Sequence, residues 1–228
     1  MIQLYNAFIY QPIFNFLIWL YNIIPGHDIG IAIIVLTLAV RFLMVPLTVK
    51  QVKSQKALQE LQPKMDEIKR KYKDDREKQS KELMKFYKEH KINPLASCLP
   101  LLIQLPIIFA LFRAFRAGLT SSGLEVLYPF VAKPEVINPM FLGLVDLSQK
   151  NIILAVLAGI AQFIQSKMIM PKTKKAKGMA GMMSKQMTYF MPVITVFIAM
   201  SLPAGLALYW LTTTLFAIGQ QYFVMKKK

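Results

Sequence analysis

The stretch that decides the fold is Ile29 to Val49, which reads IGIAIIVLTLAVRFLMVPLTV. It has 21 residues and a single charge, Arg41. A helix rises about 1.5 Å per residue, so this stretch would span roughly 30 Å, the thickness of the hydrocarbon core of a bilayer. Arg41 precedes Lys50 by nine residues, which places it roughly 14 Å inside the membrane if Lys50 marks the interface. An arginine at that depth costs about 2.5–3.5 kcal/mol on insertion scales, so it must snorkel, pair with a carboxylate or serve a function.

The composition of the 228-residue chain is that of a membrane protein. Hydrophobic residues make up 55% of it and the mean hydropathy is +0.41, whereas soluble domains are about 45–50% apolar. The single cysteine excludes an internal disulfide, and no His or Cys cluster has the spacing of a metal site. The sequence also lacks glycine-rich phosphate loops and the motifs of serine and zinc hydrolases. We therefore expect no catalytic residue, no metal and no cofactor.

Uncharged runs divide the chain into the segments of an all-α polytopic membrane protein. Five transmembrane helices are predicted, and the last two are separated by Pro203-Ala204-Gly205. The predicted spans cover residues 29–49, 94–116, 151–170, 186–202 and 204–225. The remaining segments are a soluble insertion at 50–93, an extracytoplasmic loop at 117–150, a cytoplasmic basic loop at 171–185 and a basic tail at 226–228.

Residues 1–24 carry no charge and are rich in aromatic side chains. Their polar residues recur at mostly helical spacing, with Pro12 as an expected kink, which predicts an N-terminal amphipathic interfacial helix on the outer surface. A sixth transmembrane span is the competing interpretation. The segment lacks the basic start and the small-residue cleavage site of a signal peptide.

The insertion at 50–93 is predicted to form a cytoplasmic antiparallel helical hairpin. Apolar residues step by 3 and 4 along its first half, and a second apolar face follows the polar break Lys73-Asp74-Asp75. The apolar positions of the first half are Leu58, Leu61, Met65, Ile68 and Tyr72. Pro63 is expected to kink or restart the first arm. Most lysines of the hairpin are interpreted as a solvated outer face.

Three segments, 50–92, 167–185 and 226–228, hold 23 of the 28 basic residues. Five spans place all three on one side of the membrane, and the positive-inside rule makes that side cytoplasmic. We therefore predict a bacterial plasma-membrane protein with its N-terminus outside and its C-terminus in the cytoplasm. Lysines of the basic loop are expected to set this topology and to contact anionic lipid, with RNA contact as the weaker alternative. These lysines are Lys172, Lys174, Lys175, Lys177 and Lys185.

Arg41 has no acidic residue in any predicted span with which to pair. Polar residues on the other spans lie nine to thirteen positions from the cytoplasmic ends of their helices, close to the depth of Arg41. They include Gln104, Gln162, Thr195 and Thr213. Polar residues at membrane depth tend to face a bundle interior or a water-filled cavity, so we predict a hydrated cavity in the cytoplasmic half of the bundle. Ordinary interhelical hydrogen bonding is the alternative for the glutamines and threonines.

A cavity with one charge, open to the cytoplasm and closed by an apolar outer half, suits a device that inserts other proteins. It would lower the cost of moving a polar segment partway across the bilayer, and Arg41 would attract acidic residues of that segment. A solute or ion transporter or channel is the alternative function. A channel needs polar groups along its full length, and a transporter usually shows inverted repeats and an acidic site, neither of which is evident here.

Four stretches resemble the YidC/Oxa family of membrane protein insertases. NPLASCLPLLIQLP at 93–106 resembles the second core span of that family, and LTLAVRFLMVPLT at 36–48 is similar to its first. FMPVITVF at 190–197 resembles the fourth span, and LPAGLALYW at 202–210 resembles the last hairpin.

The resemblance implies a monomeric five-span core with a groove open to cytoplasm and lipid, and groove positions at Arg41, Gln104 and Trp210. It implies nascent membrane proteins as clients, with the Sec translocon and the ribosome as further partners. The sequence has neither the large periplasmic domain nor the long basic tail of some members. Ribosome contact would therefore fall to the 172–185 loop and the hairpin.

Overall fold

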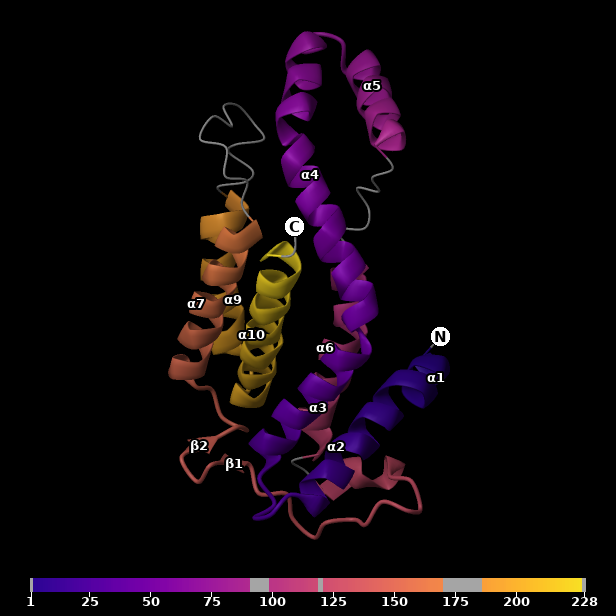
Figure 1. Ribbon diagram of the computed structural model, residues 1–228. Helices are drawn as coiled ribbons and strands as arrows, with labels where there is room; N and C mark the ends of the chain where they lie inside the picture. Colours follow the sequence, from indigo (N-terminus) through magenta and orange to yellow (C-terminus); the bar gives the residue numbers. More distant parts are fainter. Residues whose placement is uncertain (1, 91–98, 119–120, 170–185, 227–228) are drawn as a thin grey trace.

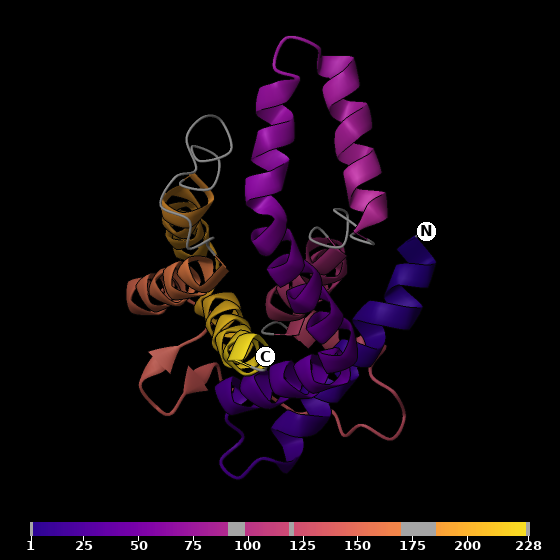
Figure 2. The ribbon, with the colours of Figure 1, turned by 45° about the horizontal axis from the view of Figure 1, so that its top comes forward.

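The computed structural model describes residues 2–90, 99–118, 121–169 and 186–226, which form a mostly helical protein (Figure 1). A bundle of helices makes up the body of the molecule. Two helices form a long projection from this bundle (Figures 1 and 2). The N-terminal helix and a loop with two short strands lie at the end away from the tip of the projection (Figure 1).

The N-terminal rod packs an apolar face against the bundle and leaves other apolar side chains exposed. It consists of α1 (Ile2–Tyr5), a π-helical turn (Asn6–Tyr10) and α2 (Gln11–Ile23). Phe14 and Ile18 are almost fully buried, in the same apolar cluster as Ile33 of the next helix. Phe8 and Trp19 are exposed, as suits a surface that meets lipid.

Two asparagines of α2 bind the loop that precedes α7. Asn15 Nδ2 donates to the carbonyl of Val126 at 3.1 Å, and Asn15 Oδ1 accepts the N–H of Tyr128 at 2.6 Å. Asn22 Nδ2 donates to the carbonyl of Ala132 at 2.7 Å. Asn15 and Asn22 thus hold the loop against α2, and the interfacial location of residues 1–24 stays a prediction.

A sharp bend divides the stretch from Ile29 to Val49. α3 (Ile29–Leu43) and the first part of α4 (Val45–Lys71) meet at 67°. Pro46 has no N–H to bond the carbonyl four residues earlier, and its ring crowds that turn, which accounts for the interruption at Met44. The residues from Val45 onward, which we predicted to finish the first span, therefore belong to the helix that continues into the projection.

Within the described residues, no helix taken alone is both long and apolar enough to cross a membrane, although α3 with Val45–Leu58 meets these conditions as a bent pair. Shorter apolar helices cover Gln104–Arg113, Ile152–Met168 and Thr188–Ser201. The division into five transmembrane spans stays a prediction.

The projection consists of α4 and α5 (Arg76–Glu89), which lie side by side and run in opposite directions (Figures 1 and 2). Asp75 Oδ1 caps α5 by accepting a backbone N–H of its first turn at 2.9 Å. Gln79 Nε2 donates to the carbonyl of Lys69 at 2.9 Å and so ties the start of α5 to the end of α4. α4 continues through Pro63, so the first arm is not restarted there.

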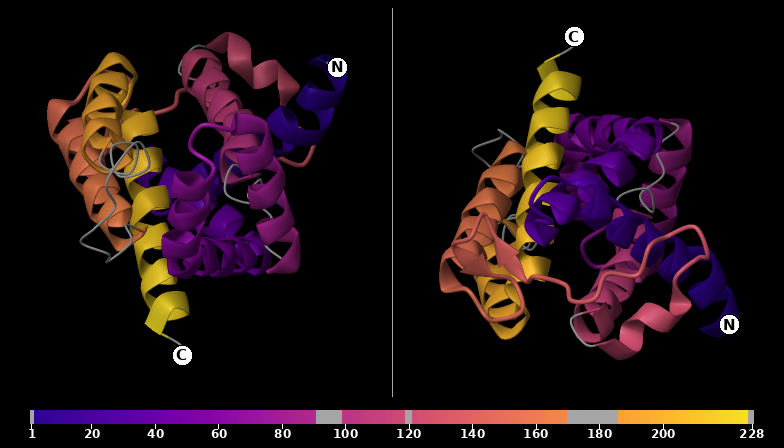
Figure 3. Two further views of the ribbon diagram at one scale, coloured as in Figure 1. Left: turned by 90° about the horizontal axis from the view of Figure 1, so that it is seen from above. Right: turned by 90° about the horizontal axis from the view of Figure 1, so that it is seen from below.

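The body of the bundle places α10 between two groups of helices. Its elements are α6 (Leu99–Gly118), α7 (Ile152–Ile169), a π-helical turn (Gln186–Phe190), α9 (Met191–Ser201) and α10 (Ala204–Lys226). Seen end-on, α7 and α9 lie on one side of α10, and α3, α4 and α6 lie on the other (Figure 3). Gly159 allows α7 and α9 to approach closely, because an added Cβ there would collide with the side chain of Val196.

The loop before α7 is bound to the end of the bundle that lies away from the projection. It contains a 3-10 turn (Ser121–Val126) and the antiparallel strands β1 (Met140–Phe141) and β2 (Val145–Asp146). The carbonyls of Leu147 and Gln149 accept the N–H groups of Gly205 and Ala204 at 3.0 and 2.8 Å, which ties the loop to the start of α10. The largest fully buried apolar side chains are Phe14, Ile18, Ile33, Leu111 and Leu147.

Candidate functional site

A polar cavity of about 380 Å³ lies between α3, α4, α6, α7 and α10. Its lining is unusual in amide content, since seven of its sixteen residues are glutamines. The polar lining comprises Arg41, Thr48, Gln51, Gln55, Gln104, Gln162, Gln165, Tyr209, Trp210, Thr213, Thr214, Gln220 and Gln221. Val52, Ile108 and Ala217 complete it. Arg41 is the one formal charge among these lining residues.

Arg41 anchors a hydrogen-bonded chain across three helices. It lies in the last turn of α3, is half-buried, and donates from Nη2 to Oε1 of Gln104 on α6 at 3.3 Å. Gln104 Nε2 in turn donates to the hydroxyl of Tyr209 on α10. Within the part of the chain that the structure describes, Arg41 forms no ion pair. A neutral amide thus orients the guanidinium while its charge remains uncompensated.

The first turns of α4 form one wall of the cavity. Thr48, Gln51, Val52 and Gln55 recur at spacings of three and four, so they share one helix face. Gln220 Nε2 of α10 donates to Oγ1 of Thr48 at 2.6 Å, which joins this wall to α10. The bend at Met44 directs this face of α4 toward the same cavity as Arg41, although the two belong to consecutive helices.

The structure brings together five of the six residues that we predicted for the groove. Arg41, Gln104, Gln162, Trp210 and Thr213 all line the cavity. Thr195 does not, because it belongs to α9, which packs against α7, and only 2% of its surface is exposed. The five lysines predicted to contact lipid or ribosome, at 172, 174, 175, 177 and 185, lie outside the described residues.

Most of the glutamines that line the cavity were not predicted from the sequence. The predicted bounds place Thr48 at the end of a span and Gln51 and Gln55 in the soluble hairpin, where membrane depth does not apply. Gln220 and Gln221 lie nearer the basic tail than Thr213, the residue predicted for the groove on the last span. The available signal was the spacing of Thr48, Gln51 and Gln55, which puts three polar residues on one face next to a helix break.

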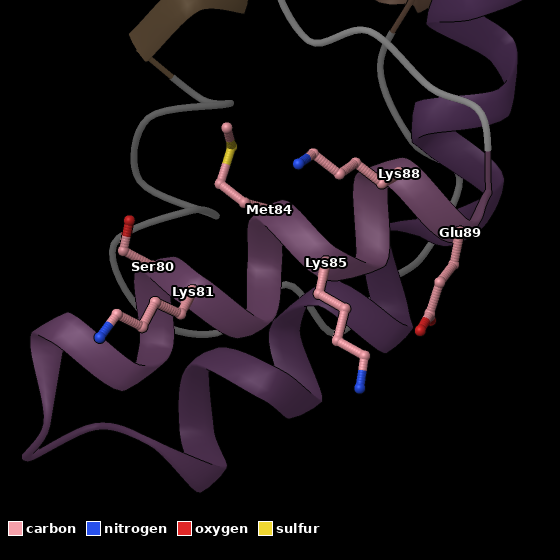
Figure 4. A pocket seen from close by; sticks show the side chains of 6 residues that line it. All are labelled: Ser80, Lys81, Met84, Lys85, Lys88 and Glu89. Atoms are coloured by element: carbon pink, nitrogen blue, oxygen red, sulfur yellow. The ribbon is translucent and has the colours of Figure 1, made fainter.

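A second hollow, of about 410 Å³, lies on the surface of α5 and is a weaker candidate. All of its lining residues come from this single helix: Ser80, Lys81, Met84, Lys85, Lys88 and Glu89. Figure 4 shows Met84 and Lys88 pointing to one side of the helix and Lys85 and Glu89 to another. Lys81 pairs with Glu77 at 2.6 Å, and both side chains are more than 70% exposed. Such a pair contributes little energy, so this face is a solvated helix surface.

The chemistry of the cavity is hydrogen bonding and charge attraction. Among the described residues, no carboxylate, histidine or cysteine lines it, and no group of three or more metal-ligating side chains occurs anywhere. Amides and hydroxyls can satisfy the polar groups of a guest in a low-dielectric surrounding, where an unpaired polar group is costly. The cavity is therefore suited to hold a polar guest and to stabilise a negative charge on it.

Comparisons with known proteins identify relatives of the chain. Residues 19–228 match the family model described as 60Kd inner membrane protein. The chain is 38% identical to the membrane protein insertase YidC of Fusobacterium nucleatum over 223 residues, which cover 97% of the chain and 98% of that relative. It is also 38% identical to the YidC insertase of Syntrophus aciditrophicus, over 95% of the chain but 36% of that longer protein.

A solved structure is similar as well. The crystal structure of an active YidC insertase with its first transmembrane domain resolved superposes with a TM-score of 0.66 at 29% identity. The match covers 96% of the chain and 46% of the solved protein. The chain thus corresponds to nearly the whole of one relative and to less than half of others.

Proposed function

Because the chain belongs to the YidC family of membrane protein insertases, the 60Kd inner membrane proteins, we propose that it inserts and folds client transmembrane segments through the Arg41 cavity. One observation carries this proposal: an arginine without an ion-pair partner in the described residues lies in an amide-lined cavity formed by five helices. A charge kept in such a place at a cost in stability is typical of a binding function.

The cavity would act by replacing water around the polar tail of a client. Moving unpaired peptide groups or charges into hydrocarbon costs several kcal/mol, and a hydrated cavity partway across the bilayer reduces that cost. Arg41 would attract acidic tail residues. The hydrophobic segment of the client would meanwhile pass along exposed apolar residues beside the cavity, such as Leu43, which is 81% exposed, and Phe42, whose ring packs edge-on against Phe216.

Membership in a family of inner membrane proteins supports a location in the membrane. We infer the finer topology from the charge distribution: five spans, the N-terminus outside, and the α4–α5 projection and basic segments in the cytoplasm. Cooperation with the Sec translocon, contact of the basic loop with anionic lipid or the ribosome, and a monomeric state belong to the same proposal. The insertase names of the relatives do not favour a solute or ion pathway.

The proposal is tested by complementation. A bacterium depleted of its own insertase is made to express this chain, and insertion of a short, weakly hydrophobic client with an acidic translocated tail is followed by protease protection. We expect insertion to be restored by the wild-type chain and by Arg70→Gln, which alters an exposed arginine of α4 outside the cavity. Failure of the wild-type chain to restore insertion would refute the proposal. Ion flux through reconstituted liposomes that depends on Arg41 would favour the alternative function.

A further inference from the structure

Two glutamines of the cavity each have a buried polar atom that lacks a partner. Gln51 of α4 is 8% exposed and Gln221 of α10 is 5% exposed. Gln51 Nε2, a donor, and Gln221 Oε1, an acceptor, have no hydrogen-bond partner among the described residues. Leaving a buried polar atom unpaired is costly. These two amides therefore point to a bound molecule that supplies the missing hydrogen-bond acceptor and donor.

Two other polar groups of the lining are already engaged, while the hydroxyl of Thr213 is a third buried atom without a partner among the described residues. Gln104 bridges Arg41 and Tyr209, and Gln220 binds Thr48. These contacts join helices and leave little capacity for a guest. Gln51 and Gln221 also line the cavity, and their unpaired atoms form no bond that joins elements of the bundle.

The missing partners together match a peptide group. Gln51 Nε2 requires an acceptor and Gln221 Oε1 requires a donor, which are the C=O and N–H that every non-proline residue carries. Both glutamines are neutral, so they do not select the charge of a guest. The pair stands on α4 and α10, two helices in contact, so a chain in the cavity meets both walls at once.

We propose that Gln51 and Gln221 recognise the main chain of an unfolded client tail, Gln51 donating to a peptide carbonyl and Gln221 accepting a peptide N–H. This inference rests on the proposed insertase function and deepens it. A tail that is not yet helical carries unpaired backbone groups that must be satisfied away from water. Arg41 then discriminates between tails by charge, whereas the two glutamines bind tails of any sequence that keeps its N–H and C=O groups.

The experiment combines single substitutions with two forms of one client. One form has a neutral tail of serine and glycine, and in the other, proline replaces every tail residue. Proline lacks the N–H but keeps the C=O. Gln221→Leu should therefore lower insertion of the serine–glycine tail about fivefold and change insertion of the proline tail much less. Gln51→Leu should lower insertion of both tails by a similar factor, because both offer carbonyls.

Stability supplies a readout that separates binding from folding. Replacing an unpaired buried amide by leucine removes a desolvation penalty, so neither variant should lower the thermal midpoint in detergent. If leucine does prevent folding, Gln51→Met and Gln221→Met repeat the test with an unbranched side chain. Gln62→Leu on α4, outside the cavity lining, serves as the matched control and should insert both tails normally.

The outcomes are distinct. Insertion at wild-type levels by both cavity variants overturns the inference while leaving the insertase function intact. An equal loss for both tails in Gln221→Leu also overturns it, because such a loss would show that the amide holds water or shapes the cavity. If the wild-type chain inserts neither tail, the proposed function itself fails and the inference falls with it.

Discussion

Replacing Arg41 by glutamine should impair the insertion of acidic clients far more than that of neutral ones. The guanidinium is half-buried and has no ion-pair partner within the described residues. A client carboxylate about 4 Å away would be attracted by about 4 kcal/mol at an effective dielectric constant near 20. Desolvation offsets part of this, and hydrogen bonds to charged groups contribute about 1.5–3 kcal/mol net. The loss should thus be about tenfold or more for one acidic residue.

The assay compares two forms of one client that differ by a single Asp or Asn in the translocated tail. Insertion is measured by protease protection in cells depleted of their own insertase. Arg41→Gln should lower insertion of the Asp tail selectively, Arg41→Lys should retain part of it, and Arg41→Glu should lose most of it. Arg70→Gln, an exposed arginine of the same chain, is the control. Equal insertion of the Asp and Asn tails by Arg41→Glu would refute the electrostatic role.

Three further predictions concern the scaffold of the cavity. Gly159→Val should lower the stability of the detergent-solubilised protein by about 1–3 kcal/mol, because the new side chain overpacks the α7–α9 contact. Gly219→Ala, where an added Cβ meets nothing within 4 Å, should leave the thermal midpoint unchanged or raise it; equal losses in the two variants would contradict the packing argument. Pro46→Ala restores a backbone donor at the bend, so the angle of 67° between α3 and α4 should decrease in spin-label distance measurements; an unchanged distance would show that tertiary packing sets the bend. Asp28→Ala should cost about 1–2 kcal/mol in thermal unfolding, because Asp28 caps α3 at 3.0 Å and also accepts a loop N–H at 2.6 Å; an unchanged midpoint would mean that water replaces the cap.

Depth along a helix could be predicted from the sequence, but rotation about the helix axis could not. Counting from the ends of their predicted spans places Gln162 and Thr195 at about one level. The structure places Gln162 in the cavity lining and buries Thr195 in α9 beside α7. Because successive residues turn by about 100° around a helix, a level shared by several spans does not say which side chains converge. That information comes from packing partners, such as Val196 against Gly159.

The hydropathy pattern also does not predict the helix break at Met44. An apolar run as long as a bilayer is thick favours one straight span, and the run from Ile29 to Val49 fits that length. Pro46 locally overrides this preference by removing one backbone hydrogen bond. Once the break lies at Met44, Gln51 and Gln55 become walls of the cavity rather than the start of a soluble arm. A proline near the end of a predicted span therefore warrants examining the polar residues that follow it.

The continuity of α4 makes it a lever. From Met44, Gln51 lies seven residues along this helix and Lys71 lies 27 residues along it, which corresponds to about 10 Å and about 40 Å. If α4 turns as a rigid rod about the break, a shift of the cavity wall at Gln51 becomes a roughly fourfold larger shift at the far end. Conversely, a ligand bound at the tip of the projection restrains the cavity wall, because a force applied at the tip acts on Gln51 through a roughly fourfold longer arm.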